Sequence, residues 1–216
     1  MNRRQLLLGS LVPMIGGVGL LAPSSPASLA KKAKKAKKKG RKKYKIVTRT
    51  FRNLAPIMLP DVGPASLYPS PIQVKGLKQG VVRDVNLILH GFSHESPDDL
   101  DMLLVGPDGT AVQFMRDAGT VTNVTNLTLT IDDQAPGPMP QFGELESKAY
   151  KPSIYSGVNL LPPPAPGFIT GGTLSVFKQH KANGVWKLYI NDNSNNLDSG
   201  SISGGWSLKI RARVRR

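Results

Sequence analysis

The sequence predicts an all-β protein, a jelly-roll β-sandwich of about eight or nine short strands. In many segments, apolar and polar side chains alternate with a period of two residues, as in strands that bury one face. Glycine, proline and aspartate separate these segments at short intervals, which is typical of turns between strands. Apolar residues nowhere recur at helical spacing over three turns. These features together favour two packed sheets.

The clearest alternation lies in residues 81–117, where we expect three consecutive strands. Val85, Leu87 and Leu89 alternate with residues that face the other way, so one row of side chains is predicted to point inward. Residues 100–105 are almost all apolar, so this strand is expected to be covered on both faces.

A tight turn is expected at residues 106–109, which read Gly-Pro-Asp-Gly. Pro107 sets φ for the first central position of the turn, and Gly109 tolerates a positive φ. The turn leads into a strand over residues 110–115.

Further strands are predicted on both sides of this stretch. Residues 44–51 and 71–74 alternate, whereas five prolines make residues 55–71 an extended, turn-rich segment. Later strands are predicted at residues 124–131, 184–190 and 206–210. The side chains expected to seal the space between the two sheets include Leu87, Leu104, Trp186 and Trp206.

Residues 134–172 form a long polar connection that is rich in proline and glycine. Connections of this length are uncommon in compact domains, so this one is a candidate functional loop. Tyr150, Tyr155 and Phe168 are predicted to hold it against the sandwich.

Positive charge is concentrated towards the ends of the chain. Residues 1–43 contain 12 of the 29 Lys and Arg residues and no Asp or Glu. Residues 44–216 carry the remaining 17 basic residues and all 14 acidic ones, and five of these basic residues lie in the last eight positions. The predicted folded domain, residues 44–216, is therefore close to neutral.

Residues 1–30 are predicted to be an export signal that resembles the twin-arginine type. Arg3 and Arg4 precede an apolar run over residues 6–21, and residues 28–30 form a small-residue cleavage site. The run is shorter than the roughly 20 residues that span a bilayer. We therefore expect a secreted or cell-envelope protein, the alternative being a cytosolic domain on a reversed membrane anchor.

A lysine-rich arm follows, which begins at Lys31 and ends at Lys43. Its ten positive charges repel one another and no large apolar residue interrupts them, so we expect it to be disordered. Anionic envelope polymers or lipids are its expected partners, and a plain flexible spacer is the alternative. Specific nucleic-acid binding is not expected, because aromatic residues do not interleave with the lysines.

The residue types argue against catalysis. The chain has no cysteine, which excludes a thiol nucleophile and disulfide bonds. Ser93, His94 and Asp98 are close in sequence, but no G-x-S-x-G turn is present and triad members are brought together by the fold rather than by sequence proximity. We therefore predict no catalytic residues.

Four aspartates are candidate ligands for calcium, the one cofactor that the sequence suggests. Asp99 and Asp101 lie at the start of one predicted strand, and Asp132 and Asp133 follow the end of another. Were these strand ends to converge, the carboxylates would supply the oxygen ligands that Ca²⁺ takes. The alternative is that they accept backbone hydrogen bonds in turns.

Several blocks of sequence lie in a fixed order within residues 45–212. The blocks are residues 84–87, 90–94, 97–101, 103–110, 127–130, 183–189 and 200–208. In this order they resemble the P domain (P/Homo B domain) of kexin- and furin-like proprotein convertases, in a bacterial stand-alone form. The resemblance implies a β-sandwich that stabilises a subtilisin-like protease and tunes its dependence on calcium and pH. Serine-type endopeptidase activity would belong to the protease domain, which this sequence lacks.

The sequence therefore predicts a secreted, non-catalytic module that binds or stabilises a subtilisin-like protease or another surface protein. The alternative is a regulatory subunit, either activator or inhibitor, of a separately encoded subtilisin-like protease. In that alternative, residues 134–172 would enter the groove of the partner.

Overall fold

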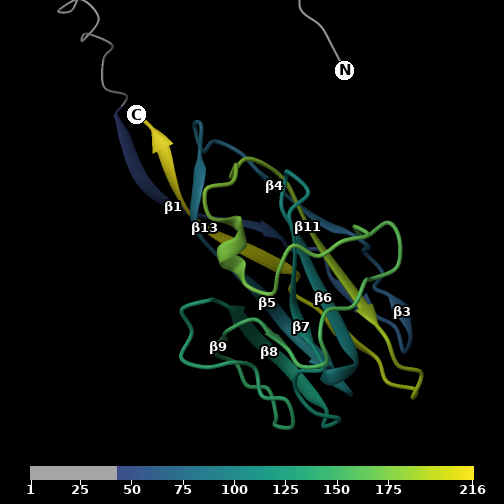
Figure 1. Ribbon diagram of the computed structural model, residues 1–216. Helices are drawn as coiled ribbons and strands as arrows, with labels where there is room; N and C mark the ends of the chain where they lie inside the picture. Colours follow the sequence, from purple (N-terminus) through teal and green to yellow (C-terminus); the bar gives the residue numbers. More distant parts are fainter. Residues whose placement is uncertain (1–42) are drawn as a thin grey trace, which may run out of the picture. The chain divides into compact units, whose positions relative to one another are not determined.

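The alternating segments form two β-sheets in the computed structural model, which describes residues 43–216 (Figure 1). The predicted export signal, and the predicted lysine-rich arm up to residue 42, lie outside the described residues. Within residues 43–216, no helix is long and apolar enough to cross a membrane.

Each sheet is mostly antiparallel, with a short parallel pair at one side. The first sheet runs in the order β1 (Tyr44–Asn53), β13 (Trp206–Arg215), β5 (Val81–His94), β12 (Gly200–Ile202) and β2 (Ile57–Leu59), with β8 (Val124–Ile131) on β5 and β9 (Ala149–Tyr150) on β8. The second runs in the order β10 (Ser153–Ile154), β7 (Ala111–Arg116), β6 (Leu100–Val105), β11 (Gly184–Asp192) and β3 (Gly63–Pro64), with β4 (Ser70–Val74) also on β11.

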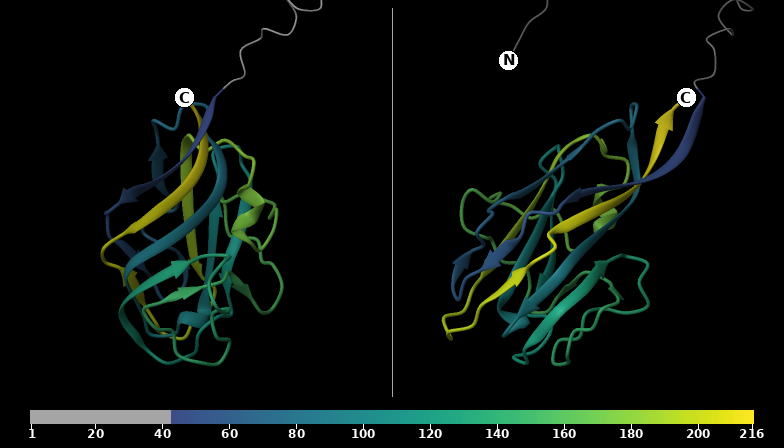
Figure 2. Two further views of the ribbon diagram at one scale, coloured as in Figure 1. Left: turned by 90° about the vertical axis from the view of Figure 1, so that its left-hand side faces the viewer. Right: turned by 180° about the vertical axis from the view of Figure 1, so that it is seen from behind.

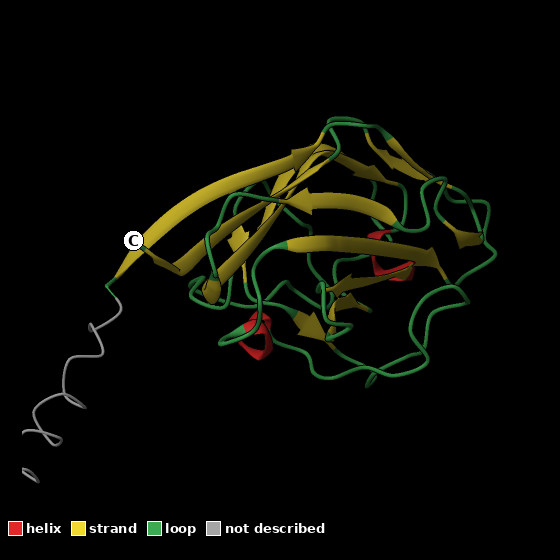
Figure 3. Cartoon of the chain, turned by 90° about the horizontal axis from the view of Figure 1, so that it is seen from above, coloured by secondary structure: helices red, strands yellow, loops and turns green. Residues whose placement is uncertain are grey.

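The predicted all-β sandwich is confirmed, and the described residues contain thirteen strands rather than eight or nine. The difference comes from strands of two or three residues, which are too short to show alternation in the sequence. The helical structure in residues 43–216 is confined to two short 3-10 turns, η1 (Pro97–Asp99) and η2 (Leu174–Phe177) (Figure 3).

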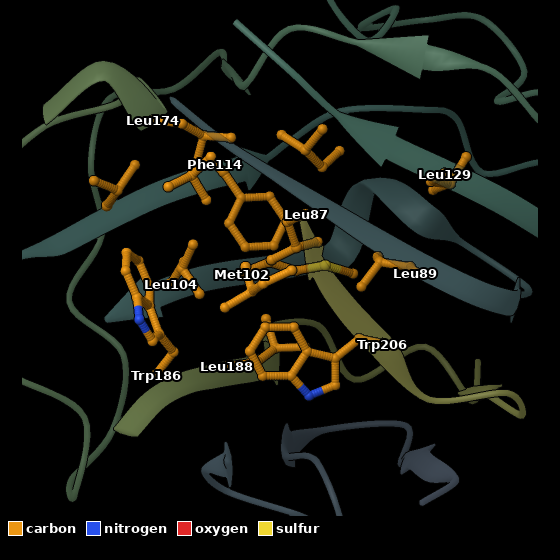
Figure 4. Close-up of a cluster of buried hydrophobic side chains, with 14 of the residues drawn as sticks. Leu87, Leu89, Met102, Leu104, Phe114, Leu129, Leu174, Trp186, Leu188 and Trp206 are labelled. Atoms are coloured by element: carbon orange, nitrogen blue, oxygen red, sulfur yellow. The ribbon is translucent and has the colours of Figure 1, made fainter. Parts of the chain in front are cut away.

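The core lies between the two sheets and includes the four side chains predicted to seal it. Leu87, Leu104, Trp186 and Trp206 are all fully buried in one cluster (Figure 4). Both indole N–H groups have acceptors, because Trp186 donates to the carbonyl of Ala182 at 3.0 Å and Trp206 donates to the Ser70 hydroxyl at 2.9 Å.

β6 is buried on both faces, as its composition predicts. Leu104 belongs to the core between the sheets, whereas Leu103 and Val105 belong to a second cluster on the opposite face. Ala111 of β7, Tyr189 of β11 and Leu161 of the long connection also belong to that second cluster. The long connection is therefore a cover for the outer face of the second sheet.

The predicted turn at residues 106–109 joins β6 to β7. Gly109 has a φ of +88°, and its N–H donates to the carbonyl of Gly106 at 3.1 Å. The Asp108 carboxylate accepts a hydrogen bond from the Thr110 N–H at 3.2 Å. The residue types thus act as expected for this turn.

The aromatic residues predicted to hold the long connection do so only in part. Tyr150 is buried in the main core, and the Tyr155 hydroxyl donates to the carbonyl of Met139. The prediction that Phe168 holds the connection is wrong, because 58% of the surface of Phe168 is exposed. The contact with the second sheet comes instead from Leu161, with the Tyr68 hydroxyl donating to the carbonyl of Pro162 at 2.7 Å.

Leu87→Ala is expected to lower the free energy of unfolding by about 2–5 kcal/mol, because it leaves a cavity between the sheets. Met58→Ala is the control, since Met58 is largely exposed and truncation there should change stability by about 0.5 kcal/mol or less. Urea denaturation of both variants checks the difference. Equal losses would contradict the core assignment.

Candidate functional site

A buried carboxylate anchors the long connection to the second sheet. Asp101 of β6 is fully buried, and its Oδ1 accepts a hydrogen bond from Gln113 Nε2 of β7 at 3.1 Å. Its Oδ2 accepts from Asn159 Nδ2 at 2.9 Å, and the Asn159 N–H donates to Gln113 Oε1 at 3.0 Å. Asp101, Gln113 and Asn159 therefore form a closed triangle of hydrogen bonds.

Further donors compensate the buried charge of Asp101. Asn193 Nδ2, in the connection after β11, donates to Oδ2 at 3.1 Å, and an Arg116 nitrogen lies 3.7 Å from Oδ1. Burial raises the pKa of Asp101, and the hydrogen bonds from Asn193 and Asn159, together with the charge of Arg116, oppose that rise. A buried charge with this many donors orders the groups around it.

The residues on either side of Asn159 are apolar and exposed to solvent. Val158 is 62% exposed and Leu160 is 56% exposed, whereas Leu161 is 5% exposed and packs in the second cluster. We call residues 158–161 the display segment. The hydrogen bonds of Asn159 and the packing of Leu161 hold the backbone of the display segment against the second sheet. Val158 and Leu160 are therefore exposed to solvent on an ordered segment.

The other predicted calcium ligands are already engaged as hydrogen-bond acceptors. Asp99 Oδ2 accepts from Asn196 Nδ2 at 3.0 Å. Asp132 Oδ2 accepts from Asn86 Nδ2 at 2.7 Å. The two oxygens of Asp133 accept the N–H groups of Leu174 and Ser175, at 2.9 and 2.6 Å, at the start of η2.

The four aspartates fall into two groups that the fold does not bring together. Asp99 and Asp101 bind the connection after β11, whereas Asp132 and Asp133 bind β5 and η2. As four ligands of one ion they do not fit. In residues 43–216, no group of three or more His, Asp or Glu side chains is placed to hold a metal.

A buried histidine–aspartate pair links the two sheets close to Asp99. His94 Nε2, at the end of β5, lies 3.2 Å from Asp192 Oδ2, at the end of β11, and both side chains are inaccessible to solvent. The Ser96 N–H donates to His94 Nδ1 at 3.1 Å, so the proton of a neutral ring lies on Nε2. Neither His94 Nε2 nor Asp192 Oδ2 has a hydrogen-bond partner among the described residues.

Burial and neighbouring carboxylates shift the pKa values of this pair. Burial is the largest cause of a rise in the pKa of Asp192 to about 7, and the charges of Asp99, Asp61 and Asp198 add to it. Burial also lowers the pKa of His94. Both shifts favour the uncharged forms of the pair in the folded protein, and Asp192 begins to lose its proton as the pH approaches 7.

Ser93, His94 and Asp98 do not come together as a triad. Ser93 and His94 are neighbours on β5 and face opposite sides of the sheet. The Ser93 hydroxyl accepts a hydrogen bond from the Asn126 N–H at 2.8 Å, while Asp98 accepts one from the Ser96 hydroxyl at 3.0 Å.

A serine–histidine contact that the sequence does not reveal lies on the first sheet. His90 Nε2 is 2.8 Å from the hydroxyl of Ser207, which faces it from β13. Ser207 is 1% exposed, so its hydroxyl is inaccessible to a substrate. We interpret this contact as a cross-strand hydrogen bond.

Other features of the site also lack a clear sequence signal. His94 points inward because a β-bulge at Gly91, where φ is +68°, shifts the alternation of β5 by one residue. Gly91 is the one residue whose type marks this shift in advance. The partners of Asp101 are distant in sequence, and nothing local to Asn159 or Asn193 indicates that contact.

No protein-family model and no curated protein sequence matches this chain. Among solved structures, it is similar to the crystal structure of a serine protease of Aeromonas sobria, with 12% sequence identity and a TM-score of 0.37. The match covers 82% of this chain and 28% of the protease chain, so this chain spans little more than a quarter of that protein. Similarity at this level transfers no activity to the present chain.

Asp192→Asn is expected to remove a fall in stability that runs from about pH 4 to about pH 7 and levels off above pH 7. The folded protein keeps a proton on Asp192 up to about pH 7, whereas an unfolded chain loses it near pH 3.9, so stability falls as the pH rises towards 7. The slope is at most about 1.4 kcal/mol per pH unit, the value for one proton.

Thermal unfolding across this range, with a chelator present, measures the slope. The lowered pKa of His94 acts in the opposite direction, since stability is then lost as the pH falls below about 6.5, the pKa of an unfolded histidine. The difference between the slopes of the wild type and the variant therefore measures the contribution of Asp192. Identical slopes in the wild type and the variant would contradict this account.

Proposed function

We propose that this protein is an exported, non-catalytic module that binds and stabilises a subtilisin-like protease. The observation that carries the proposal is the display segment, in which a buried hydrogen-bond triangle supports two exposed apolar side chains. Exposed apolar groups on a rigid scaffold are typical of protein-binding sites. The resemblance of residues 45–212 to the P domain supports a protease as the partner.

The proposed mechanism is binding by a preordered surface. Asp101 and Gln113 hold Asn159, and Leu161 is packed in the second cluster, so little conformational entropy remains to be lost in this segment when a partner binds. Val158 and Leu160 would enter an apolar depression on the partner. Phe168, on the same connection, offers a further exposed apolar side chain.

The alternative function is regulation of the protease, by activation or inhibition. It is favoured by the same connection, because a segment that projects apolar side chains is suited to enter a substrate groove. The two functions differ in their effect on the partner. A stabilising module raises the melting temperature of the protease, whereas a regulatory subunit changes its turnover rate on a peptide substrate.

The double variant Val158→Asp, Leu160→Asp is expected to weaken capture of the protease at least tenfold, because charge is placed in an apolar interface. Tagged protein from the exported fraction, with bound proteins identified by mass spectrometry, provides the measurement. Leu54→Asp combined with Met58→Asp is the matched control, since both residues are similarly exposed elsewhere. Failure of the wild type to capture a subtilisin-like protease would overturn the proposal.

Calcium binding stays a prediction, and Asp99 is the predicted ligand that this test addresses. In residues 43–216 no group of three or more His, Asp or Glu side chains is placed to hold a metal, but the charges of Asp99, Asp61 and Asp198 all raise the pKa of Asp192, and a cation near Asp99 would relieve their repulsion. Millimolar Ca²⁺ should raise the melting temperature by mass action, with a smaller rise in Asp99→Asn and no change of the rise in Asp133→Asn. Absence of any rise in the wild type, compared with Mg²⁺ at equal ionic strength, would retire calcium.

A further inference from the structure

Four basic side chains lie in a row on the outer face of the first sheet. Lys209, Arg211, Arg213 and Arg215 alternate along β13, and we call them the basic row. The residues between them point into the core and are buried, so the two-residue period places the basic row on the opposite face. The buried residues are Leu208, Ile210, Ala212 and Val214.

Protection of a sheet edge does not explain the basic row. Lysines on edge strands prevent sheets from pairing with one another, but β13 lies inside the sheet, between β1 and β5. Figure 2 shows β1 and β13 side by side along their length. The edge strand on this side is β1, which carries uncharged Thr48 and Thr50 opposite Arg211 and Lys209.

The charges of the basic row are also not neutralised by the protein itself. In residues 43–216, no ion pair includes a member of the row. Asp84 of β5 stands opposite Arg211 in the sheet register without forming an ion pair with it. Arg213 packs its guanidinium over the Tyr44 ring at 4.9 Å, and its buried Nε has no hydrogen-bond partner among the described residues.

The spacing of the row suits a linear polyanion. Alternate residues of a strand are about 6.8 Å apart, so the row presents one positive charge per 6.8 Å or so along a nearly straight line. A polymer whose phosphodiester groups are separated by a three-carbon polyol has as many backbone bonds between phosphorus atoms as two residues have between Cα atoms. Its charges therefore repeat at a similar distance when both chains are extended.

We propose that the basic row binds such a polyol phosphate, with one phosphate opposite each basic side chain. Arginine is suited to this, because its planar guanidinium can donate two hydrogen bonds to one phosphate. Thr48 and Thr50 lie beside the row, where their hydroxyls meet those of the polyol. This site is separate from the display segment, and neither role depends on the other.

Single-stranded nucleic acid is less suited to this face, although its phosphates repeat similarly. Proteins that bind single strands without sequence preference stack bases on aromatic side chains. Among the residues of β1, β13 and β5 that share the face with the basic row, Tyr44 and His90 are the aromatic ones. Arg213 already covers the ring of Tyr44, and the ring of His90 is engaged with the Ser207 hydroxyl. The polyol phosphate needs no stacking surface.

The test compares two full-length variants that lose the same charge. The row variant is Lys209→Gln, Arg211→Gln, Arg213→Gln and Arg215→Gln. The control variant removes four exposed lysines elsewhere on the domain, and its substitutions are Lys75→Gln, Lys151→Gln, Lys181→Gln and Lys187→Gln. Titration calorimetry with poly(glycerol phosphate), at several salt concentrations, measures affinity and its salt dependence.

The row variant should lose at least tenfold in affinity, and its slope of log affinity against log salt should fall by about 3, from about 0.7 for each phosphate contact. The control variant should retain most of the affinity, because only long-range attraction changes. Equal losses in both variants would overturn the proposal. Should the row variant unfold, Arg211→Gln with Arg215→Gln is measured in the same way, with about half the change in slope.

Three further ligands test the chosen chemistry. A poly(ribitol phosphate) of equal charge has a longer repeat and should bind the wild type more weakly. Oligodeoxythymidine with the same number of phosphates should also bind more weakly, and so should vesicles of anionic phospholipid at equal phosphate. Tighter binding of any of the three, lost in the row variant, would assign the row to that ligand and overturn the present choice.

Discussion

The packing of one sheet against the other determines what each remaining face can do. The space between the sheets is filled by Leu87, Leu104, Trp186 and Trp206. Each sheet therefore also has an outer face, which must either be covered or be exposed to solvent. The second sheet is apolar on its outer face and is covered by the long connection. The first sheet is basic and polar on the outer face of β13, and no described segment covers the basic row. The two proposed binding surfaces therefore follow from the different side chains on the two outer faces, which are apolar on the second sheet and basic on β13 of the first.

Much of the fold follows from alternation that is visible in the sequence. Val85, Leu87 and Leu89 are buried, as the period of two predicts, and the apolar strand β6 is covered on both faces. The period cannot show where its own phase changes, because a bulge depends on the partner strand. At Gly91 the phase shifts, and His94 becomes an inward residue that meets Asp192 across the two sheets.

The candidate site is less accessible to sequence reasoning than the fold. Aspartates near strand ends indicate where polar connections lie, but they do not show which strand ends meet. Asp101 proves to anchor the long connection, whereas Asp132 and Asp133 bind β5 and η2. The length and composition of the connection mark it as unusual, yet Leu161 rather than Phe168 holds it, because burial there depends on the shape of the surface beneath.

The position of β13 inside the first sheet also has a consequence for biosynthesis. β1 and β13 pair along their whole length, although nearly the entire domain separates them in the chain. A ribosome therefore produces β1 long before the strand that completes its hydrogen bonds, and β5 likewise waits for the same neighbour. Until then both present open backbone edges, which favour pairing with other chains. The edges of β1 and β5 that pair with β13 therefore stay open in the nascent domain until β13 has emerged.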